Sequence, residues 1–529
     1  MKKFLVAIVF LVLANPLPAQ QLEALVQQYT TQGKALGIRA NLNGVVLVAK
    51  NNKIILNKAY GFASLNPKQA LTTDSKFLIG SVTKPFVAQL ILQQVAKGNI
   101  KLSQPITDFL PYIDKEKGKH ITIHRLLTHT SGIPHYDGLR GHIKSMRAFS
   151  SKKMTPTEYG QLVNKTGLVA IPGSKYQYSS LGYVLLGAVL EKATGLTFSQ
   201  LLENQIAKPL HLKNTGFGDN AFLQQEIVKN YRFSKGKYKE SPNRDQSNTY
   251  TAGGMHSTAK ELFIWSQALQ NNTLLNKRFT KKFFKKNLNG YTYGWMRNDK
   301  EILKYIPQAQ FYGHSGSVNI FTSYVFLGDD GTTIIVLSNA GRIQPYKLVA
   351  DIYRKMHNED LSKSSRIIVP GYRSKAQFFK EGGYEGITNY HKVLSKSAGF
   401  QIFPSGGYLQ RVIRMHIKEK MDTNPLEKVL HSCIKKNQDA EDMLNRAGYE
   451  FAKTDAAKGL YYFTLNTKHF KTSANAWDSL GEYYEKQQLP YKAAKAYAKA
   501  VALAHTYFHT NTSSFEKNLA RVKKKTQNK

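Results

Sequence analysis

The sequence contains one cysteine, few acidic residues and almost no long hydrophobic run. The single cysteine, Cys433, excludes an internal disulfide framework. Beyond the first 20 residues, no stretch is apolar enough to predict a transmembrane helix. The hydrophobic content of 42% and the aromatic content of 11% are nevertheless ample for packed cores, and a length of 529 residues predicts two or three domains.

Acidic residues number 35 against 75 lysines and arginines, which gives a formal net charge of +40. Such an excess favours anionic surroundings, such as an anionic lipid or an acidic polymer of the cell envelope. A well-solvated basic surface without any partner explains the same charge equally well, because charge alone identifies no partner. Both interpretations stay open, and we expect no nucleic-acid partner.

The N-terminus indicates the compartment. Lys2 and Lys3 precede an apolar run from Phe4 to Ala14, and residues 15–20 then break that run with two prolines. A positively charged start, a short apolar run and a small residue near a cleavage point are typical of a signal peptide. No cysteine stands at the predicted cleavage point, so nothing there supports a lipid anchor. The sequence therefore predicts a signal peptide over residues 1–20 and an exported protein, periplasmic or secreted.

Two common kinds of catalytic site lack their motifs. No G-x-S-x-G segment exists, which argues against an α/β-hydrolase. Five histidines lie close together in the sequence, but they form no H-E-x-x-H motif and have no cysteine partner, so we expect no metal site and no cofactor. These histidines are His120, His124, His129, His135 and His142.

The stretch 77–84, Phe-Leu-Ile-Gly-Ser-Val-Thr-Lys, is the strongest catalytic candidate. An amphipathic helical pattern runs from Val82 to Gly98, so Ser81 is expected at a helix N-terminus, where the dipole favours developing negative charge. Lys84 lies one turn further on the same face. A partly desolvated lysine can take the proton of a serine hydroxyl, which predicts nucleophilic catalysis. The spacing alone is weak, because five other serines have a lysine three residues later.

Strands are expected on both sides of this helix in the sequence. Residues 44–50 and 53–59 predict a hairpin with a turn at Asn51-Asn52. Residues 320–326 and 332–337 predict a second antiparallel pair, with His314 at its head. A strand that begins in small residues can let a substrate backbone lie alongside it.

Tyr178 is expected in a loop just ahead of an apolar helix over residues 184–190. Its phenol could relay a proton if nearby cations lowered its pKa. A tyrosine that serves only packing is the alternative, and in a chain with 30 tyrosines it is favoured unless the surrounding motifs decide otherwise.

Three motifs in this order resemble the serine β-lactamase and D-Ala-D-Ala-peptidase superfamily, specifically its class C-like, β-lactamase-related branch. They are Ser-Val-Thr-Lys at 81–84, Tyr-Ser-Ser at 178–180 and His-Ser-Gly at 314–316. Accessory motifs also match those of this superfamily, and the resemblance covers roughly residues 22–351. These motifs are Leu-Leu-Thr-His-Thr-Ser-Gly at 126–132, Pro-Gly with Tyr-Ser and Leu-Gly-Tyr at 172–183, and Ala-Gly-Gly-Met at 252–255.

The resemblance implies a mixed α/β (α+β) fold with an antiparallel sheet flanked by helices. It implies that Ser81 is acylated and that Lys84 and Tyr178 act as base and proton relay. The backbone N–H groups of Ser81 and Ser317 would form the oxyanion hole, which stabilises the tetrahedral intermediate.

The substrate-binding residues implied by the resemblance are Ser180, His314, Ser315 and Gly316, and two of them depart from the common pattern. Ser180 replaces the usual asparagine of Tyr-x-Asn, and His314 replaces the usual lysine. A histidine has a pKa near neutrality, so we expect carboxylate binding at His314 to depend on pH. Both changes argue against efficient β-lactam hydrolysis, and neither removes the acyl-enzyme chemistry.

The C-terminal part has a different pattern. Residues 361–425 are predicted to be a linker or a small unassigned region. From 426 to 529 the pattern is helical, and Trp477, Leu480, Gly481 and Tyr484 match the start of a tetratricopeptide repeat. We expect a short helical repeat domain that either docks on the catalytic domain or offers a peptide-binding groove; plain structural helices are the alternative.

Together these features predict an exported serine hydrolase, with its catalytic domain over residues 21–360. Its substrate is expected to be a D-amino-acid peptide derived from the cell wall, a simple ester or a β-lactam, in falling order of support. The alternative is a non-catalytic protein in which the pocket at Ser81 has lost its catalytic role and only binds a ligand, and in which the helical repeats recruit a partner. The joint presence of Ser81, Lys84 and Tyr178 argues against that alternative.

Overall fold

The computed structural model describes residues 19–139, 143, 153–218, 225–234, 236–241, 246–363, 366–434 and 440–527. The predicted signal peptide lies outside these ranges except for its last two residues, and His142 also lies outside them.

A six-stranded antiparallel sheet with the order β2-β1-β12-β11-β10-β9 forms the centre of the fold. The predicted hairpin is confirmed as β1 and β2, and Asn51 and Asn52 have φ angles of 48° and 66°, as a tight two-residue turn requires. The strands of this sheet are β1 (Gly44–Lys50), β2 (Lys53–Tyr60), β9 (Met296–Arg297), β10 (Phe311–Val318), β11 (Phe321–Gly328) and β12 (Thr332–Ser338). Short pairs lie outside it: β3 (Phe62–Leu65) with β4 (Lys68–Ala70), β5 (Phe77–Leu78) with β8 (His256–Ser257), and β6 (Asn230–Ser234) with β7 (Lys237–Ser241).

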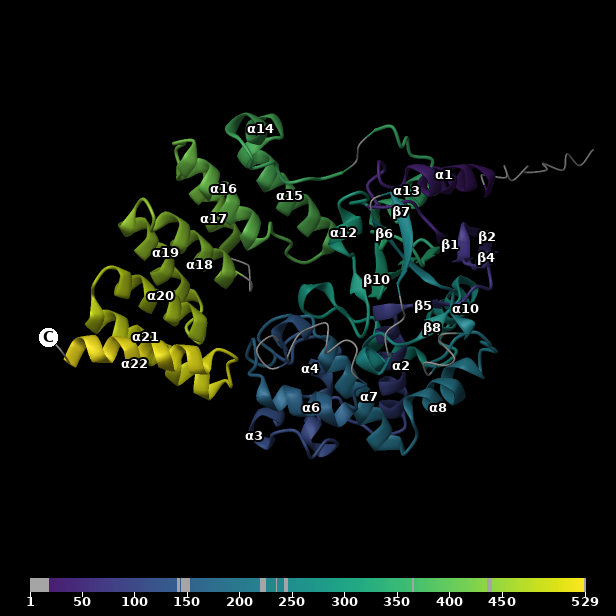
Figure 1. Cartoon of the computed structure of the whole chain (residues 1–529), viewed down its shortest axis with the longest axis horizontal. Helices are drawn as coiled ribbons and strands as arrows, with labels where there is room; N and C mark the ends of the chain where they lie inside the picture. The colour runs from purple at the N-terminus through teal and green to yellow at the C-terminus, as the bar shows by residue number, and fades with distance from the viewer. Residues whose placement is uncertain are drawn as a thin grey trace, which may run out of the picture.

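Helices cover both faces of the sheet, which explains why its central strands are buried along almost their whole length (Figure 1). Val45 and Leu47 of β1 face a core with α2, α7 and α10, while Val46 and Val48 face α1 and α13. The helices up to residue 356 are α1 (Ala19–Gln32), α2 (Thr83–Ala96), α3 (Lys115–Gly118), α4 (Ile123–Leu127), α6 (Pro156–Lys165), α7 (Ser180–Thr194), α8 (Phe198–Leu202), α10 (Ala259–Gln270), α11 (Lys277–Phe283), α12 (Lys300–Leu303) and α13 (Tyr346–Met356).

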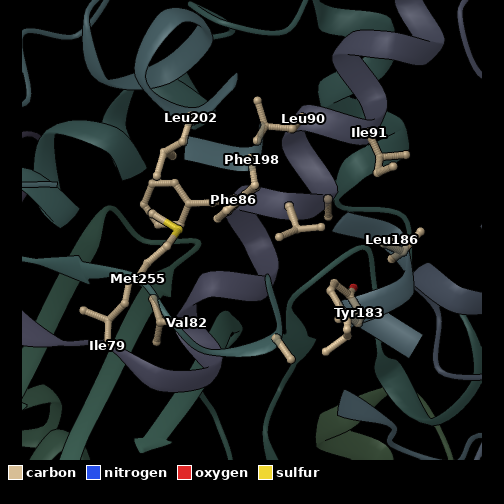
Figure 2. Packing of buried hydrophobic residues seen from close by; sticks show 14 of the residues in the cluster. Ile79, Val82, Phe86, Leu90, Ile91, Tyr183, Leu186, Phe198, Leu202 and Met255 are labelled. Atoms are coloured by element: carbon tan, nitrogen blue, oxygen red, sulfur yellow. The ribbon is translucent and has the colours of Figure 1, made fainter. Parts of the chain in front are cut away.

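Helix α2 is buried on nearly all sides, so the predicted amphipathic pattern is wrong in this respect. Every residue from Thr83 to Gln94 is buried, and the polar side chains among them are hydrogen-bonded, as Gln89 is to the Trp265 indole at 2.7 Å. Phe86 stacks on Trp265 with ring centroids 3.6 Å apart. Figure 2 shows apolar side chains from several elements gathered around this helix. The helix that follows Ser81 is thus fixed by packing along its length.

The predicted pair of strands over residues 320–326 and 332–337 is confirmed as β11 and β12. The position of His314 was predicted wrongly, because His314 does not lead into this pair. It lies in the middle of a further strand, β10, which pairs with β11 in the register His314 to Val325. The small residues after His314 therefore belong to a strand of their own and do not begin β11.

Within the described ranges, no single helix is long and apolar enough to cross a bilayer. In that same part of the chain, one pair of helical segments, α7 with 198–207, meets the requirements of length and composition together, and it is bent by 80°.

The C-terminal helices form an arm beside the sheet domain (Figure 1). Three of them lie in the region left unassigned from the sequence, and α15 packs on the core that contains α1 and α13 through Tyr390 and Leu394. The helices are α14 (Lys375–Lys380), α15 (Gly383–Ala398), α16 (Gly406–Lys418), α17 (Asn424–Ile434), α18 (Ala440–Phe451), α19 (Ala456–His469), α20 (Ala474–Lys486), α21 (Pro490–Thr506) and α22 (Thr512–Gln527).

Consecutive helices of this arm pack closely at glycines. A Cβ on Gly448 would lie 2.9 Å from Phe463, and a Cβ on Gly481 would lie 2.6 Å from Tyr497. The expectation of helices over residues 426–529 is confirmed for the described part of that range, and their assignment as tetratricopeptide repeats stays a prediction.

The end of the arm touches the sheet domain through backbone groups. The Leu168 N–H donates to the Phe508 carbonyl at 2.6 Å, and the Thr510 N–H donates to the Leu168 carbonyl at 3.1 Å. Leu168 belongs to the connection between α6 and α7, which also contains Tyr178. The C-terminal helices therefore hold one side of the loop that carries the predicted proton relay.

Candidate active site

Ser81 lies in a single 3₁₀ turn, Gly80–Val82, that leads directly into α2. Gly80 has a φ of +54°, and a Cβ there would lie 2.6 Å from the Ser317 nitrogen, so this position favours glycine. Lys84 follows in the first turn of α2, and its Nζ donates to the Ser81 Oγ at 3.0 Å. The predicted place of Ser81 beside a helix N-terminus agrees with this geometry.

Lys84 is fully buried. Its Nζ donates to the Ala252 carbonyl at 2.6 Å and to the Ser180 Oγ at 3.3 Å, in addition to Ser81. Among the described residues, no carboxylate forms an ion pair with it. Burial lowers the pKa of Lys84 from 10.5 to about 7, so a large fraction of the amine is neutral near neutral pH. This lysine can therefore accept the proton of Ser81.

Tyr178 lies over the same lysine, with its ring centroid 5.0 Å from Lys84 Nζ. Burial raises the pKa of Tyr178, and hydrogen bonds with Ser81 and Ser180 offset only part of that effect. The expectation that nearby cations lower its pKa is therefore wrong. Tyr178 is a neutral phenol that can receive a proton only as it passes one on.

His129 packs against Tyr178 and is hydrogen-bonded to its loop. Its ring lies 4.2 Å from the Tyr178 ring, and its Nδ1 accepts the Ser179 N–H at 3.1 Å. Burial lowers the pKa of His129 well below its usual value, with a smaller contribution from Lys84, so the ring is neutral. His129 belongs to the accessory motif at 126–132, and its role could not be predicted because the contact joins segments 50 residues apart.

Strand β10 brings a second backbone segment to Ser81. A Cβ on Gly316 would lie 2.0 Å from the Ile79 carbonyl oxygen, so only glycine allows this approach. Ser323 donates to the same carbonyl at 2.6 Å. The approach places Ser317 against Gly80, one residue from Ser81, as a shared oxyanion hole requires. Gly316 thus acts through packing rather than by offering a group to substrate.

His314 does not have the properties expected from the sequence. Burial, with a smaller contribution from the Lys84 charge, lowers its pKa to about 3. Its Nδ1 lies 2.7 Å from the Ser315 carbonyl and must donate to it, which leaves Nε2 as the acceptor for the Tyr291 hydroxyl at 3.3 Å. The ring is neutral above about pH 4, so the expected pH-dependent binding of a carboxylate at His314 is wrong.

The two predicted serines lie in different places. Ser180 begins α7 and accepts from Lys84, and its backbone N–H donates to His135 Nδ1 at 3.1 Å. Ser315 lies on β10, where its side chain bonds with Tyr346. Both line the cavity over Ser81, so contact with a substrate is feasible for each.

A cavity of about 610 Å³ opens over Ser81. Three of its side chains were missed by sequence reasoning: Arg342, whose Nε donates to Ser317 Oγ at 3.3 Å, and Asp299 and Tyr346. No local motif marks them, since each reaches the cavity from an element remote in sequence. Elsewhere, no group of three His, Cys, Asp or Glu side chains in the described ranges could hold a metal ion.

Comparison with known proteins identifies the family of the sheet domain. Residues 22–355 match the Beta-lactamase family. The protein flp of Staphylococcus aureus (strain COL) is 26% identical over 352 residues, which cover 64% of this chain and 66% of that relative, just under two thirds. The putative penicillin-binding protein PbpX of Bacillus subtilis (strain 168) is 26% identical over 297 residues, 56% of this chain and 70% of that relative.

Solved structures share the fold at lower identity. The octameric penicillin-binding protein homologue from Pyrococcus abyssi has a TM-score of 0.55 at 22% identity, over 65% of this chain and 78% of that chain. The D-amino acid amidase from Ochrobactrum anthropi SV3 has a TM-score of 0.53 at 23% identity, over 64% of this chain and 99% of that chain. The chain therefore belongs to the Beta-lactamase family.

Proposed function

We propose that this protein is an exported serine hydrolase that forms an acyl-enzyme at Ser81. The observation that carries the proposal is the contact of 3.0 Å between Ser81 Oγ and Lys84 Nζ, in which burial lowers the pKa of the lysine to about 7. A neutral amine so close to a hydroxyl is the base that a serine nucleophile needs.

In the first half-reaction, Lys84 takes the Ser81 proton while Oγ bonds to the substrate carbonyl carbon. The backbone N–H groups of Ser81 and Ser317 stabilise the resulting oxyanion. As the bond to the leaving group breaks, Tyr178 passes a proton to that group and regains one from Lys84. Water then attacks the ester, loses its proton along the same route and releases Ser81 and the product acid.

His314 does not favour a free carboxylate beside the scissile bond, and the cavity cation that such a carboxylate could meet is Arg342 at Ser317. His314 is neutral, and both of its ring nitrogens already have partners, so it offers no charge to such a carboxylate. We therefore rank D-amino-acid amides or peptides first, simple esters next and β-lactams last. A D-amino acid amidase and EstCE1, a hydrolase with promiscuous acyltransferase activity, are among the structural neighbours.

The test is the intact mass of the protein after exposure to an activated ester and to a penicillin. We expect an adduct on the unchanged protein and none on Ser81→Ala. Ser514→Ala is the matched control, because Ser514 also has a lysine three residues later but lies exposed on α22. An adduct that persists in Ser81→Ala contradicts the proposal. Absence of any adduct on the folded protein would favour the non-catalytic ligand-binding alternative.

A further inference from the structure

Helix α11 and the residues just after it carry a cluster of cations that the proposed catalysis does not use. Residues 262–298 contain seven lysines and arginines and no aspartate or glutamate. Arg297 pairs with Asp329, and the other six form what we call the α11 patch. Among the residues that the structure describes, none of these six forms an ion pair with a carboxylate. The α11 patch consists of Lys277, Arg278, Lys281, Lys282, Lys285 and Lys286.

The α11 patch faces solvent because the phenylalanines of the same segment face the core. Phe283 is fully buried, and Phe279 and Phe284 are half-buried against the same cluster. Five of the six cations are exposed, and Lys282 is half-buried. Apolar contacts therefore hold α11 on one side, and positive charge covers the other.

These charges oppose the helix that carries them. The first turn of α11 contains Lys277 and Arg278 and no acid, although the helix dipole favours negative charge there. Lys281 and Lys282 follow four residues later, and like charges at this spacing destabilise a helix. A surface that serves only solubility intersperses cations with acids. A local conflict of this kind, without a compensating contact inside the chain, points to a function of the patch.

The positive surface continues from α11 to α4. Burial lowers the pKa of His124 on α4, and the positive charges of Arg125, Lys282 and Lys285 lower it further. In the part of the chain that the structure describes, Arg125 also has no ion pair with a carboxylate. The two elements thus place their cations side by side.

A short loop joins the α11 patch to the cavity over Ser81. The Asn287 N–H donates to the Tyr291 carbonyl at 2.8 Å, so the chain folds back directly after α11. Tyr291 lines the cavity. Five residues separate Lys286 from Tyr291, which corresponds to at most about 18 Å. Whatever binds the patch therefore lies near the entrance of the active site.

The arrangement of the patch indicates which kind of anion it fits. Clusters of about four to eight lysines and arginines on an amphipathic helix suit anionic lipid headgroups. The cations of α11 lie on the outer side of one helix and its exit, where a flat layer of headgroups can meet them together. No phenylalanine of α11 is exposed, so nothing apolar in it is free to enter a bilayer. The attraction is therefore electrostatic and should weaken in salt.

We propose that the α11 patch binds the anionic headgroups of a membrane surface. The bound protein would then hold its active-site cavity close to the bilayer. This inference goes beyond the proposed function and does not depend on it, because binding to a surface involves no acylation.

The test is cosedimentation of the chain, without its predicted signal peptide, with large unilamellar vesicles. Vesicles of phosphatidylcholine alone are compared with vesicles that contain about 30% phosphatidylglycerol, at about 0.1 M and about 0.5 M salt. We expect a partition coefficient at least tenfold higher for the anionic vesicles at low salt, and loss of most of this binding at high salt.

A fourfold variant removes exposed cations of the patch. Each lysine or arginine near an anionic surface strengthens binding about fivefold, so the loss of four should weaken it by at least about 50-fold. The matched control removes the same charge from exposed lysines of α21 and α22, and its binding should fall less than fivefold. The patch variant is Lys277→Gln, Arg278→Gln, Lys281→Gln and Lys285→Gln; the control is Lys495→Gln, Lys499→Gln, Lys517→Gln and Lys523→Gln.

Several outcomes overturn the inference. They are equal binding to both kinds of vesicle, binding that persists at high salt, a smaller fall in the patch variant, or a fall of fivefold or more in the control. Binding to long-chain inorganic polyphosphate without binding to vesicles would assign the patch to a soluble polymer and would also overturn it. Ser81→Ala should bind vesicles as the unchanged protein does, so failure of the proposed catalysis and failure of this inference are distinguishable.

Discussion

The pH dependence of acylation should follow the titration of Lys84. This lysine is fully buried and donates to Ser81, Ser180 and the Ala252 carbonyl, and burial lowers its pKa to about 7. Only the neutral amine can take the Ser81 proton, so kcat/KM should be high above this pKa and fall as the pH drops through it.

The size of the fall follows from a single proton. The neutral fraction of an amine with a pKa of about 7 is about 0.9 at pH 8 and about 0.01 at pH 5, so kcat/KM should drop about 90-fold across this range. His314 does not titrate there, because its pKa is about 3, and the raised pKa of Tyr178 leaves the alkaline side flat. The assay is the initial rate of hydrolysis of an activated ester between pH 5 and 9.5, with circular dichroism to verify folding.

Two variants test whether the pH profile of kcat/KM reports the titration of Lys84 as the base or a general effect of any buried lysine. Lys84→Arg keeps a cation that does not deprotonate, and it should abolish hydrolysis at every pH. Lys117 is a second buried lysine, bonded to the carbonyls of Val163, Asn164 and Thr166. Lys117→Met should reduce stability and leave the midpoint of the profile unchanged. A flat profile, or a midpoint above pH 9, would refute the assignment of Lys84 as the base.

Two further predictions concern packing. Phe86→Ala should lower the free energy of unfolding by about 3–5 kcal/mol in urea, because Phe86 is fully buried against Trp265; a loss below about 1 kcal/mol would mean that the core around α2 can collapse into the space. Gly167→Val should reduce the rate of ester hydrolysis about fivefold or more, because a Cβ there would lie 2.3 Å from the Thr510 backbone and would displace the arm from the Tyr178 loop. The control is Gly407→Ala, where an added Cβ would meet no other atom within 4 Å. Unchanged rates in Gly167→Val would show that the contact does not matter for catalysis.

Features that depend on neighbours along the chain could be predicted from the sequence. The hairpin of β1 and β2 follows from two strand-like runs joined by an Asn-Asn turn, and the Ser81–Lys84 contact follows from one helical turn. The strand around His314 was not separated from the next one, because Gly316 and Ser317 fit the small-residue start of the strand over residues 320–326. Their role becomes clear only beside Ile79, more than 200 residues earlier.

Charge states and remote side chains could not be predicted in the same way. The pKa of His314 depends on burial and on Lys84, neither of which is visible in the local sequence. Asp299 and Arg342 lie in segments without any motif, and only the folded cavity brings them near Ser81. The helices over residues 375–418 were missed because glycines interrupt a mixed pattern there, yet α15 has a buried face of Ile387, Tyr390 and Leu394.

The backbone contact between Leu168 and the segment from Phe508 to Thr510 sets the time at which the Tyr178 loop gains its full support during synthesis. The ribosome adds about 5–20 residues per second, so the roughly 340 residues between these partners take on the order of 20 to 70 seconds to synthesise. Throughout that interval the loop that carries Tyr178 lacks its C-terminal support. A nascent chain that already contains Ser81, Lys84 and Tyr178 therefore still lacks the backbone contact that holds one side of the Tyr178 loop, and a chain cut short before residue 508 would never form it.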